Sequence, residues 1–215
     1  MTSKGTDRLE GAYRLKTPDD NVGYYRAFAE TYDSEFAAGL GYVYPREVAR
    51  VFRAEAGPGN SPVLDIGAGT GLVAEHMGEG PVDGIDISPE MLARAEAKGL
   101  YRRRIVADLT RPLGMPEGSY GGFVSAGTFT HGHVGPEVLD ELLRVGRPGA
   151  LYCIGINLQV FDGAGFGSAF ARLVAADRVT PLDFREVPIY EVPIYQGKAH
   201  EHAGDRGVVA VFRRL

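Results

Sequence analysis

The stretch that decides the fold is Val63-Leu64-Asp65-Ile66-Gly67-Ala68-Gly69-Thr70-Gly71. It begins as a short apolar run with one acidic residue and continues as three glycines separated by small residues. Leu72, Val73 and Met77 follow with the spacing of a helix. The pattern predicts a buried strand, a tight turn and the start of a helix.

Glycines suit such a turn for two reasons. They adopt a positive φ without strain from a Cβ atom, and they let a ligand approach the backbone closely. The free N–H groups at a helix N-terminus also attract anionic ligand atoms. The turn is therefore a candidate cradle for a nucleotide-like ligand, with a glycine-rich turn that binds nothing as the alternative.

The glycine spacing separates two classes of cofactor. A dinucleotide fingerprint reads G-x-G-x-x-G, whereas this stretch reads G-x-G-x-G and has Leu72 where the third glycine of that fingerprint would stand. Asp65 lies two residues before the first glycine. The run resembles the first motif of class I S-adenosylmethionine-dependent methyltransferases. This resemblance covers roughly residues 24–160 and implies S-adenosylmethionine as cofactor, with S-adenosylhomocysteine as its product.

Composition excludes several other classes of protein. The 215 residues contain 23 Lys and Arg against 28 Asp and Glu, and this mildly acidic balance gives no support for a nucleic-acid partner. No long apolar segment predicts a membrane span. Cys153 is the only cysteine, so an internal disulfide is excluded and a cytoplasmic location is expected. We expect no bound metal, and the oligomeric state is not readable from the sequence.

Length and composition also set the expected domain organisation. One domain is the natural expectation for a chain of this length. Residues 1–20 are polar and are expected to form a mobile or loosely docked arm. Residues 21–215 are then expected to form a single domain, with a helical cap at its N-terminal end over residues 21–56.

Strands and helices alternate along most of the chain, which predicts a mainly parallel sheet covered on both faces. The resemblance to the methyltransferases implies a three-layer, Rossmann-like α/β sandwich with a seven-stranded sheet and an antiparallel C-terminal strand. After the strand at 63–66, the predicted strands are 82–87, 101–106, 122–126, 150–156 and 208–212. Residues 184–195 are expected to be extended, but Pro188 and Pro193 argue against an uninterrupted central strand there. The predicted helices include 45–56, 88–98, one that begins at 136, and 163–176.

The cap carries aromatic residues at regular spacing. Tyr24, Phe28, Tyr32 and Phe36 recur every four residues, which predicts one helix with four rings on one face. Many methyltransferases of small molecules carry a Tyr-Asp pair on such a helix, and Tyr32-Asp33 matches it. The resemblance implies that the helix covers cofactor and substrate. Tyr32 is therefore a candidate ligand contact, with packing alone as the alternative.

Asp86 is the best single candidate for binding the cofactor. It ends the second predicted strand, where a carboxylate is placed to accept hydrogen bonds from both ribose hydroxyls. The same geometry serves NAD, so Asp86 does not separate the two cofactors.

The resemblance implies further cofactor contacts. Asp108 would accept the adenine amino group, while the backbone of Leu109 and the side chain of Ile87 would contact the ring. Asp65 would organise the amino group of the methionine part, although a structural role for this carboxyl is equally supported. The backbone of the turn and of the fourth strand would supply the remaining contacts, from Gly67, Ala68, Gly69, Gly71 and Ser125.

Two histidines follow the fourth predicted strand. His131 and His133 are candidate general bases, because a neutral imidazole accepts a proton near neutral pH. An oxygen or nitrogen acceptor of the methyl group would need such a base. The alternative for each is a loop histidine hydrogen-bonded to backbone.

The sequence also indicates which kind of molecule would accept the methyl group. Methyltransferases of nucleic-acid amino groups have Asp or Asn followed by Pro-Pro and an aromatic residue at the fourth strand, and residues 125–129 lack this motif. The basic run Arg102-Arg103-Arg104 lies within a predicted strand, which favours a solvated edge or a cluster of ion pairs. Together these features favour a small-molecule acceptor with an oxygen, nitrogen or carbon nucleophile.

A closer resemblance, to the methyltransferase-like proteins grouped with the Williams–Beuren region protein, rests on the glycine stretch, the Tyr-Asp pair and residues 127–136. Two alternatives of other classes remain. One is an NAD(P)-dependent oxidoreductase, against which Leu72 and the lack of a clear Tyr-x-x-x-Lys pair argue. The other is a protein that binds S-adenosylmethionine without transferring the methyl group.

Overall fold

The computed structural model describes residues 11, 20, 23–26, 29–191, 202 and 204–215. Its centre is a seven-stranded sheet with the strand order β3-β2-β1-β4-β5-β7-β6. Strands β1 to β5 are mutually parallel, and β7 is antiparallel to both of its neighbours. The predicted α/β sandwich with one antiparallel strand near the C-terminus is therefore confirmed. The strands are β1 Val63–Ile66, β2 Val82–Asp86, β3 Arg103–Val106, β4 Tyr120–Phe129, β5 Gly146–Asn157, β6 Asp183–Pro188 and β7 Arg206–Arg213.

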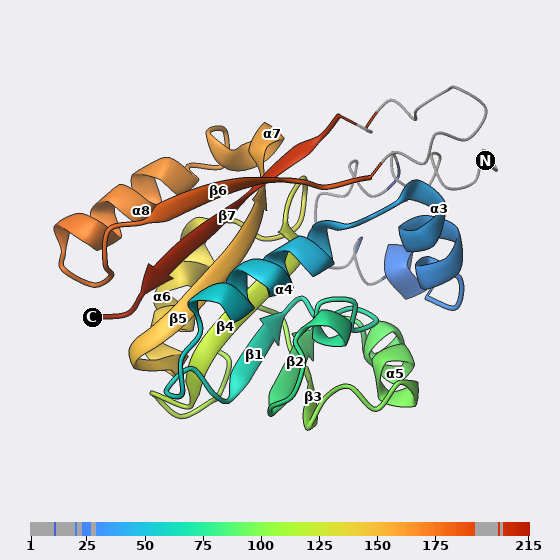
Figure 1. The fold of residues 1–215 in the computed structure, drawn as a ribbon, viewed down its shortest axis with the longest axis horizontal. Helices are drawn as coiled ribbons and strands as arrows, with labels where there is room; N and C mark the ends of the chain where they lie inside the picture. The colour runs from blue at the N-terminus through green and yellow to red at the C-terminus, as the bar shows by residue number, and fades with distance from the viewer. Residues whose placement is uncertain (1–10, 12–19, 21–22, 27–28, 192–201, 203) are drawn as a thin grey trace.

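Helices cover both faces of the sheet. α4 crosses one face over β4 and β5, and α6 lies behind it (Figure 1). The helical segments are the π-helix η1 Tyr32–Ala37, α3 Ala38–Leu40, α4 Tyr44–Glu55, the 3-10 helix η2 Ala74–His76, α5 Pro89–Ala97, the 3-10 helix η3 Pro136–Val138, α6 Leu139–Val145, α7 Leu158–Phe161 and α8 Phe166–Ala175. None of the described helices combines the length and the apolar composition that crossing a bilayer requires.

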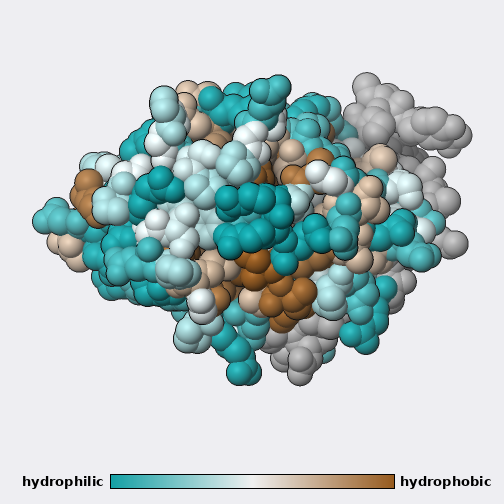
Figure 2. Space-filling view, turned by 90° about the horizontal axis from the view of Figure 1, so that it is seen from below, coloured by the Kyte–Doolittle hydropathy of each residue, from teal (hydrophilic) through white to brown (hydrophobic). Residues whose placement is uncertain are grey.

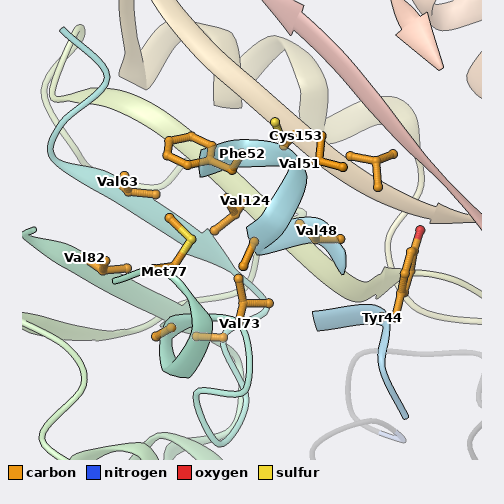
Figure 3. Packing of buried hydrophobic residues seen from close by; sticks show 14 of the residues in the cluster. Tyr44, Val48, Val51, Phe52, Val63, Val73, Met77, Val82, Val124 and Cys153 are labelled. Atoms are coloured by element: carbon orange, nitrogen blue, oxygen red, sulfur yellow. The ribbon is translucent and has the colours of Figure 1, made fainter. Parts of the chain in front are cut away.

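Two hydrophobic cores follow from the alternation of side chains along each strand. Val63 faces α4, whereas Leu64 and Ile66 face the layer of α6 and α8. In Figure 3, Val48 and Phe52 of α4 lie among side chains of the sheet and of the segment after β1. Because successive residues of a strand point to opposite faces, a four-residue strand contributes to both cores. The face of the molecule shown in Figure 2 is mostly hydrophilic, with one compact hydrophobic area.

Stacked aromatic rings tie three strands together in the second core. Phe123, Tyr152 and Phe212 are cross-strand neighbours on β4, β5 and β7. Their ring centroids lie 4.3 and 4.8 Å apart, with nearly parallel planes. The Tyr152 hydroxyl also donates to the Leu142 carbonyl of α6 at 2.9 Å. This stack fastens the antiparallel strand to the parallel part of the sheet.

Two predicted helices differ in the structure. The aromatic cap is not one helix: residues 23–26 are helical, 29–31 form a turn and η1 follows, while Phe28 lies outside the described residues. The helix expected after the glycines is only the short η2. Gly78, with φ of 79°, lies two residues after the end of η2, and its left-handed conformation stops the helix there.

One strand also ends at a different residue from the predicted one. β4 runs on to Phe129, three residues beyond the predicted end, because a register shift against β5 lets the strand continue. The arm predicted for residues 1–20 falls almost wholly outside the described residues.

The arginine run forms ion pairs, as predicted. Arg102 and Arg103 each donate two hydrogen bonds to Asp83 of β2, at 2.7 to 2.9 Å, and the Tyr120 hydroxyl donates a further one at 2.9 Å. Burial alone would raise the pKa of Asp83, but these three donors outweigh it and lower the pKa to about 2. Arg104 pairs with Glu96 of α5. β3 is thus the edge strand that the sequence favoured, held to β2 by a buried carboxylate.

We expect Asp83→Asn to destabilise the fold by about 2 kcal/mol at about pH 7, because a carboxylate with a lowered pKa stabilises the folded state above its unfolded pKa. The contribution is lost as the pH falls toward 2, so the deficit of the variant should shrink by about 1 kcal/mol between about pH 7 and about pH 3. Urea unfolding of both proteins at the two pH values measures this. A deficit that does not change with pH would contradict the electrostatic explanation.

Candidate functional site

A cavity opens at the carboxyl ends of the parallel strands, where the turns after β1, β2, β3 and β4 meet. It comprises about 760 Å³ of empty space, part of which is open to solvent. The described residues that line it are Tyr25, Tyr32, Gly67, Gly69, Asp86, Ile87, Met91, Asp108, Leu109, Thr110, Ala126, Gly127, Thr128, His133 and Val134.

The turn after β1 depends on glycine at three positions. Gly67, Gly69 and Gly71 have φ values of 65°, 52° and 91°, a region that favours glycine. A Cβ on Gly67 would lie 1.9 Å from Oγ1 of Thr128, so the turn passes against the end of β4. A Cβ on Gly71 would lie 2.6 Å from the Leu100 side chain. The first two glycines line the cavity and the third packs beneath it.

Asp86 joins two turns at the wall of the cavity. Its carboxylate accepts the Gly69 N–H and the Ser88 N–H, each at 2.8 Å. Burial raises the pKa of Asp86, and these backbone donors oppose the rise. A carboxylate offers about four lone-pair positions, so each oxygen can accept one further hydrogen bond from a ligand.

Asp108 lies across the cavity in the turn after β3. It accepts the amide and the hydroxyl of Thr110 at 2.9 and 2.6 Å. Burial would raise the pKa of Asp108, but these donors outweigh it and hold the pKa below its ordinary value. Leu109 and Ile87 supply apolar surface to the same cavity. The pairing of a carboxylate with apolar walls suits a heterocyclic base that carries an amino group.

Asp65 lies in the sheet next to the turn and is fully buried. The Tyr101 hydroxyl donates to its Oδ2 at 2.6 Å, whereas no described residue donates to its buried Oδ1. Burial raises the pKa of Asp65 to about 7, despite the hydrogen bond from Tyr101. A buried acceptor without a donor is costly, so this carboxyl is suited to a cationic or hydrogen-bonding ligand group.

A second cavity adjoins the first. It encloses about 470 Å³, part of it open to solvent, and its walls share Tyr25, Tyr32, Gly127 and His133 with the first cavity. The remaining described residues of its lining are Phe36, Tyr42, Tyr44, Phe129, Thr130, Asn157, Ile189 and Tyr190. The two cavities therefore meet at a junction formed by the cap and the end of β4.

His133 stands at this junction. Its Nδ1 lies 2.6 Å from the His131 carbonyl oxygen, which only accepts hydrogen bonds, so Nδ1 carries the proton. Its Nε2 is then the acceptor of the Tyr25 hydroxyl at 3.0 Å. Burial lowers the pKa of His133 below 6.5. The imidazole is thus a neutral base with its lone pair at the junction.

Polar contacts fasten the cap over the first cavity. Asp33 of η1 accepts the Thr70 hydroxyl at 2.5 Å and pairs with Lys98 at 2.6 Å. Arg26 pairs with Glu90 of α5 at 2.7 Å. Because Thr70 belongs to the glycine turn, the cap is attached directly to the loop that lines the cavity.

Comparison with known proteins agrees with this geometry. Residues 64–154 match a family described as a methyltransferase domain. The human methyltransferase-like protein 27 is 35% identical over 153 residues, which cover 68% of this chain and 62% of that protein. The chain thus spans less than two thirds of the length of this relative. The chain has the fold and the domain of a class I S-adenosylmethionine-dependent methyltransferase.

Solved structures show the same fold for this methyltransferase domain. The cyclase SpnF aligns with a TM-score of 0.67 at 18% identity, covering 93% of this chain and 96% of that one. A methyltransferase dependent on the same cofactor, from Aquifex aeolicus, aligns with a TM-score of 0.58 at 19% identity, covering 87% and 98%. At such identities the likeness concerns the fold alone. The narrower resemblance to the Williams–Beuren group stays a prediction.

Most residues that the sequence predicted for this methyltransferase site lie at the first cavity, and five do not. Asp65 and Ala68 are buried behind the turn, and Gly71 packs against Leu100. The hydroxyl of Ser125 is used inside the sheet, where it donates to the Ile66 carbonyl at 2.8 Å. Because β4 is longer than predicted, residues 126–128 occupy the wall instead. His131 lines neither cavity and contributes its carbonyl oxygen to His133. The predicted residues that line the first cavity are Tyr32, Gly67, Gly69, Asp86, Ile87, Asp108, Leu109 and His133.

Several lining residues were not predicted. Met91 lies in the first turn of α5, and the Ser88-Pro89 helix start could have indicated it. Tyr42 and Tyr190 come together through an antiparallel bridge between distant segments, for which the sequence offers no local signal. Phe166 and Phe170 line neither cavity and pack in the second core.

The close approach of Gly67 to β4 can be tested against a matched glycine. Gly99 has nearly the same φ, 67°, but no atom lies within 4 Å of the place for its Cβ. We expect Gly99→Ala to cost about 1 to 2 kcal/mol from backbone strain alone. Gly67→Ala should cost at least about 1 kcal/mol more, because its methyl group overlaps Thr128. Thermal or urea unfolding measures both variants. If Gly67→Ala and Gly99→Ala lose the same free energy of unfolding, the contact with Thr128 does not add to the cost of the substitution.

The tautomer of His133 is directly measurable. Nitrogen-15 chemical shifts should show the proton on Nδ1 near neutral pH, and a pKa below 6.5. Spectra of His133→Gln and His131→Gln assign the signals. We expect Tyr25→Phe to leave the Nδ1 proton in place while the Nε2 shift changes. A proton on Nε2 in the unmodified protein would rule out this nitrogen as the base.

Proposed function

We propose that the chain transfers a methyl group from S-adenosylmethionine to a small-molecule acceptor through an oxygen, nitrogen or carbon nucleophile. The observation that carries this proposal is the pair of adjoining cavities. The first has the residues that a nucleoside cofactor needs, and the second is a separate chamber that meets it at the lone pair of a neutral histidine.

The residues present fit the cofactor that the family implies. Asp86 would hold the ribose hydroxyls, and Asp108 with Leu109 and Ile87 would hold the adenine. The buried Oδ1 of Asp65, to which no described residue donates, fits the charge of an amino group acting directly or through water. The left-handed turn at Gly67 and Gly69 leaves the backbone open to the ligand.

The bound cofactor would supply a methyl group already activated by a sulfonium, and in-line displacement then asks the protein mainly for alignment and exclusion of water. The cap, which is attached through Asp33 to Thr70 and Lys98, would contribute to both by holding its aromatic residues at the cavity. For an oxygen or nitrogen acceptor, His133 takes the proton at Nε2, since its Nδ1 is already occupied by a proton directed at a carbonyl. His131 then acts only by orienting His133.

Two alternatives remain open to experiment. An NAD(P)-dependent oxidoreductase is disfavoured by the glycine spacing at Leu72 and by the matching family. Binding of S-adenosylmethionine without methyl transfer is the second alternative, since the fold itself does not fix the reaction: SpnF, which shares it, is named as a cyclase. Turnover of any methyl acceptor would refute this second alternative.

Calorimetric titration with S-adenosylmethionine and S-adenosylhomocysteine tests the first half of the proposal. We expect micromolar binding of both, weakened about a hundredfold or more in Asp86→Ala, because charged hydrogen bonds to two hydroxyls are lost. Asp83→Asn is the matched control: it lies three residues earlier on β2 but outside both cavities. Its affinity should be unchanged.

Failure would also be informative. Binding of neither ligand by the folded wild-type chain would overturn the proposal. A parallel titration with NAD would then show whether the same cavity holds a dinucleotide.

A further inference from the structure

We propose that the second cavity is the acceptor chamber and that it takes an uncharged, flat aromatic molecule carrying a hydroxyl group. The inference rests on the proposed function, because an acceptor must lie beside the cofactor. It goes beyond that function by naming the chemical class of the acceptor and the way it lies in the chamber.

The position of the chamber is the first argument. Tyr25, Tyr32, Gly127 and His133 belong to the walls of both cavities. A molecule in the second cavity therefore touches the same residues as a ligand in the first. The atom nearest this junction is the one that can react, so the group placed there decides the chemistry.

Aromatic rings form one continuous wall of the chamber. Tyr25 contacts Tyr32, Tyr32 stacks on Phe36 with centroids 4.9 Å apart, and Phe36 contacts Tyr42 at 6.0 Å. Tyr42 in turn contacts Tyr190 at 5.6 Å. Seven of the twelve described residues that line the chamber are Tyr or Phe. Such a wall gains most from another flat ring in an offset-stacked or edge-on arrangement.

The arrangement of these rings differs from a cage for a cation. A cation is held where several ring faces converge on one point. Here the rings contact one another in sequence, so their faces are partly covered by their neighbours. The planes of successive rings are tilted by 65°, 20°, 65° and 45°. The wall therefore presents ring edges as well as faces, which suits another ring in an edge-on or offset arrangement.

The charge of the lining residues favours the same chemical class of acceptor. Among the described residues that line the chamber, none is Asp, Glu, Lys or Arg. A charged molecule would gain no partner of opposite charge from these residues, and the loss of its hydration would be costly. The Tyr44 hydroxyl is already engaged, since it lies 3.1 and 3.0 Å from the carbonyls of Ile156 and Val208. An uncharged molecule suits this lining.

The hydrogen-bonding groups fix the orientation. At the junction, Nε2 of His133 accepts the hydroxyl of Tyr25, a phenol, at 3.0 Å. A phenolic hydroxyl of the acceptor would take the same place once the Tyr25 side chain turns aside. On methyl transfer, the hydroxyl oxygen would form the new bond to the methyl carbon as the bond between that carbon and the sulfonium sulfur breaks, which would leave S-adenosylhomocysteine. The hydroxyl proton would pass to Nε2 of His133, and the imidazolium would return it to solvent. The aromatic body then lies along the ring wall.

Binding of simple probes to the full chain tests the chamber without a known substrate. The probes are naphthol, methoxynaphthalene, which lacks the hydroxyl proton, and phenyltrimethylammonium, which is a cation. Each is titrated by calorimetry with and without saturating S-adenosylhomocysteine. We expect naphthol to bind about tenfold more tightly than methoxynaphthalene, and the cation to show no measurable binding.

Variants of Tyr42 locate the binding site, because Tyr42 lines the second cavity only. Tyr42→Leu should weaken the binding of naphthol about tenfold, because it removes one ring from the aromatic wall. Tyr42→Phe keeps the ring and should weaken the binding by less than about twofold. Affinity for S-adenosylhomocysteine and the melting temperature of each variant serve as controls for an intact fold.

The outcomes separate the two proposals. If the wild-type chain does not bind S-adenosylhomocysteine, the proposed function is overturned. Binding of naphthol to the chain without S-adenosylhomocysteine still tests the chamber in that case. Tighter binding of the cation than of naphthol would overturn the inference in favour of an aromatic cage. Naphthol binding that is equal in Tyr42→Leu, or absent altogether, would overturn the assignment of this cavity as the acceptor chamber.

Discussion

One carboxylate holds together the two turns on which the first cavity depends. Asp86 accepts the N–H of Gly69, in the turn after β1, and that of Ser88, which caps α5. Neighbouring parallel strands end at the same edge of a sheet, so both turns arise there. This carboxylate links them directly, beside the hydrogen bond from the Ala68 N–H to the Ile85 carbonyl at 2.9 Å. The residue best placed to bind a ligand is therefore also the residue that shapes the binding site, and any change at Asp86 acts on both.

Local signals carried most of what the sequence could predict. The glycines, the Ser88-Pro89 helix start and the Asp at the end of β2 each report on a few neighbouring residues, and all are confirmed as structural features. The pairing of Tyr25 with His133 joins residues 108 positions apart, and no local pattern specifies it. Periodicity also misled: aromatic residues four apart indicate a common face, but the turn at 29–31 interrupts the helix that this spacing predicted.

Charge is distributed unequally between the two cavities. Asp65 and Asp86 lie close to the glycine turn, and burial raises the pKa of both carboxyls. The described lining of the second cavity has no charged side chain. Two buried acids destabilise each other when both are ionised, so a cationic group bound near the turn would relieve this cost. The first cavity thus suits a polar, partly cationic molecule, and the second suits an uncharged one.

The two outer strands of the sheet also bear on how the chain behaves at high concentration. Within the part of the chain that the structure describes, β3 and β6 each leave one row of backbone hydrogen-bonding groups without a neighbouring strand. Such rows are templates for the addition of strands from other molecules. Arg103 and Arg104 lie on β3, and Asp183, Arg185 and Glu186 lie on β6. An incoming strand would have to displace or desolvate these charges. The charged side chains on β3 and β6 therefore oppose the addition of a further strand at either edge.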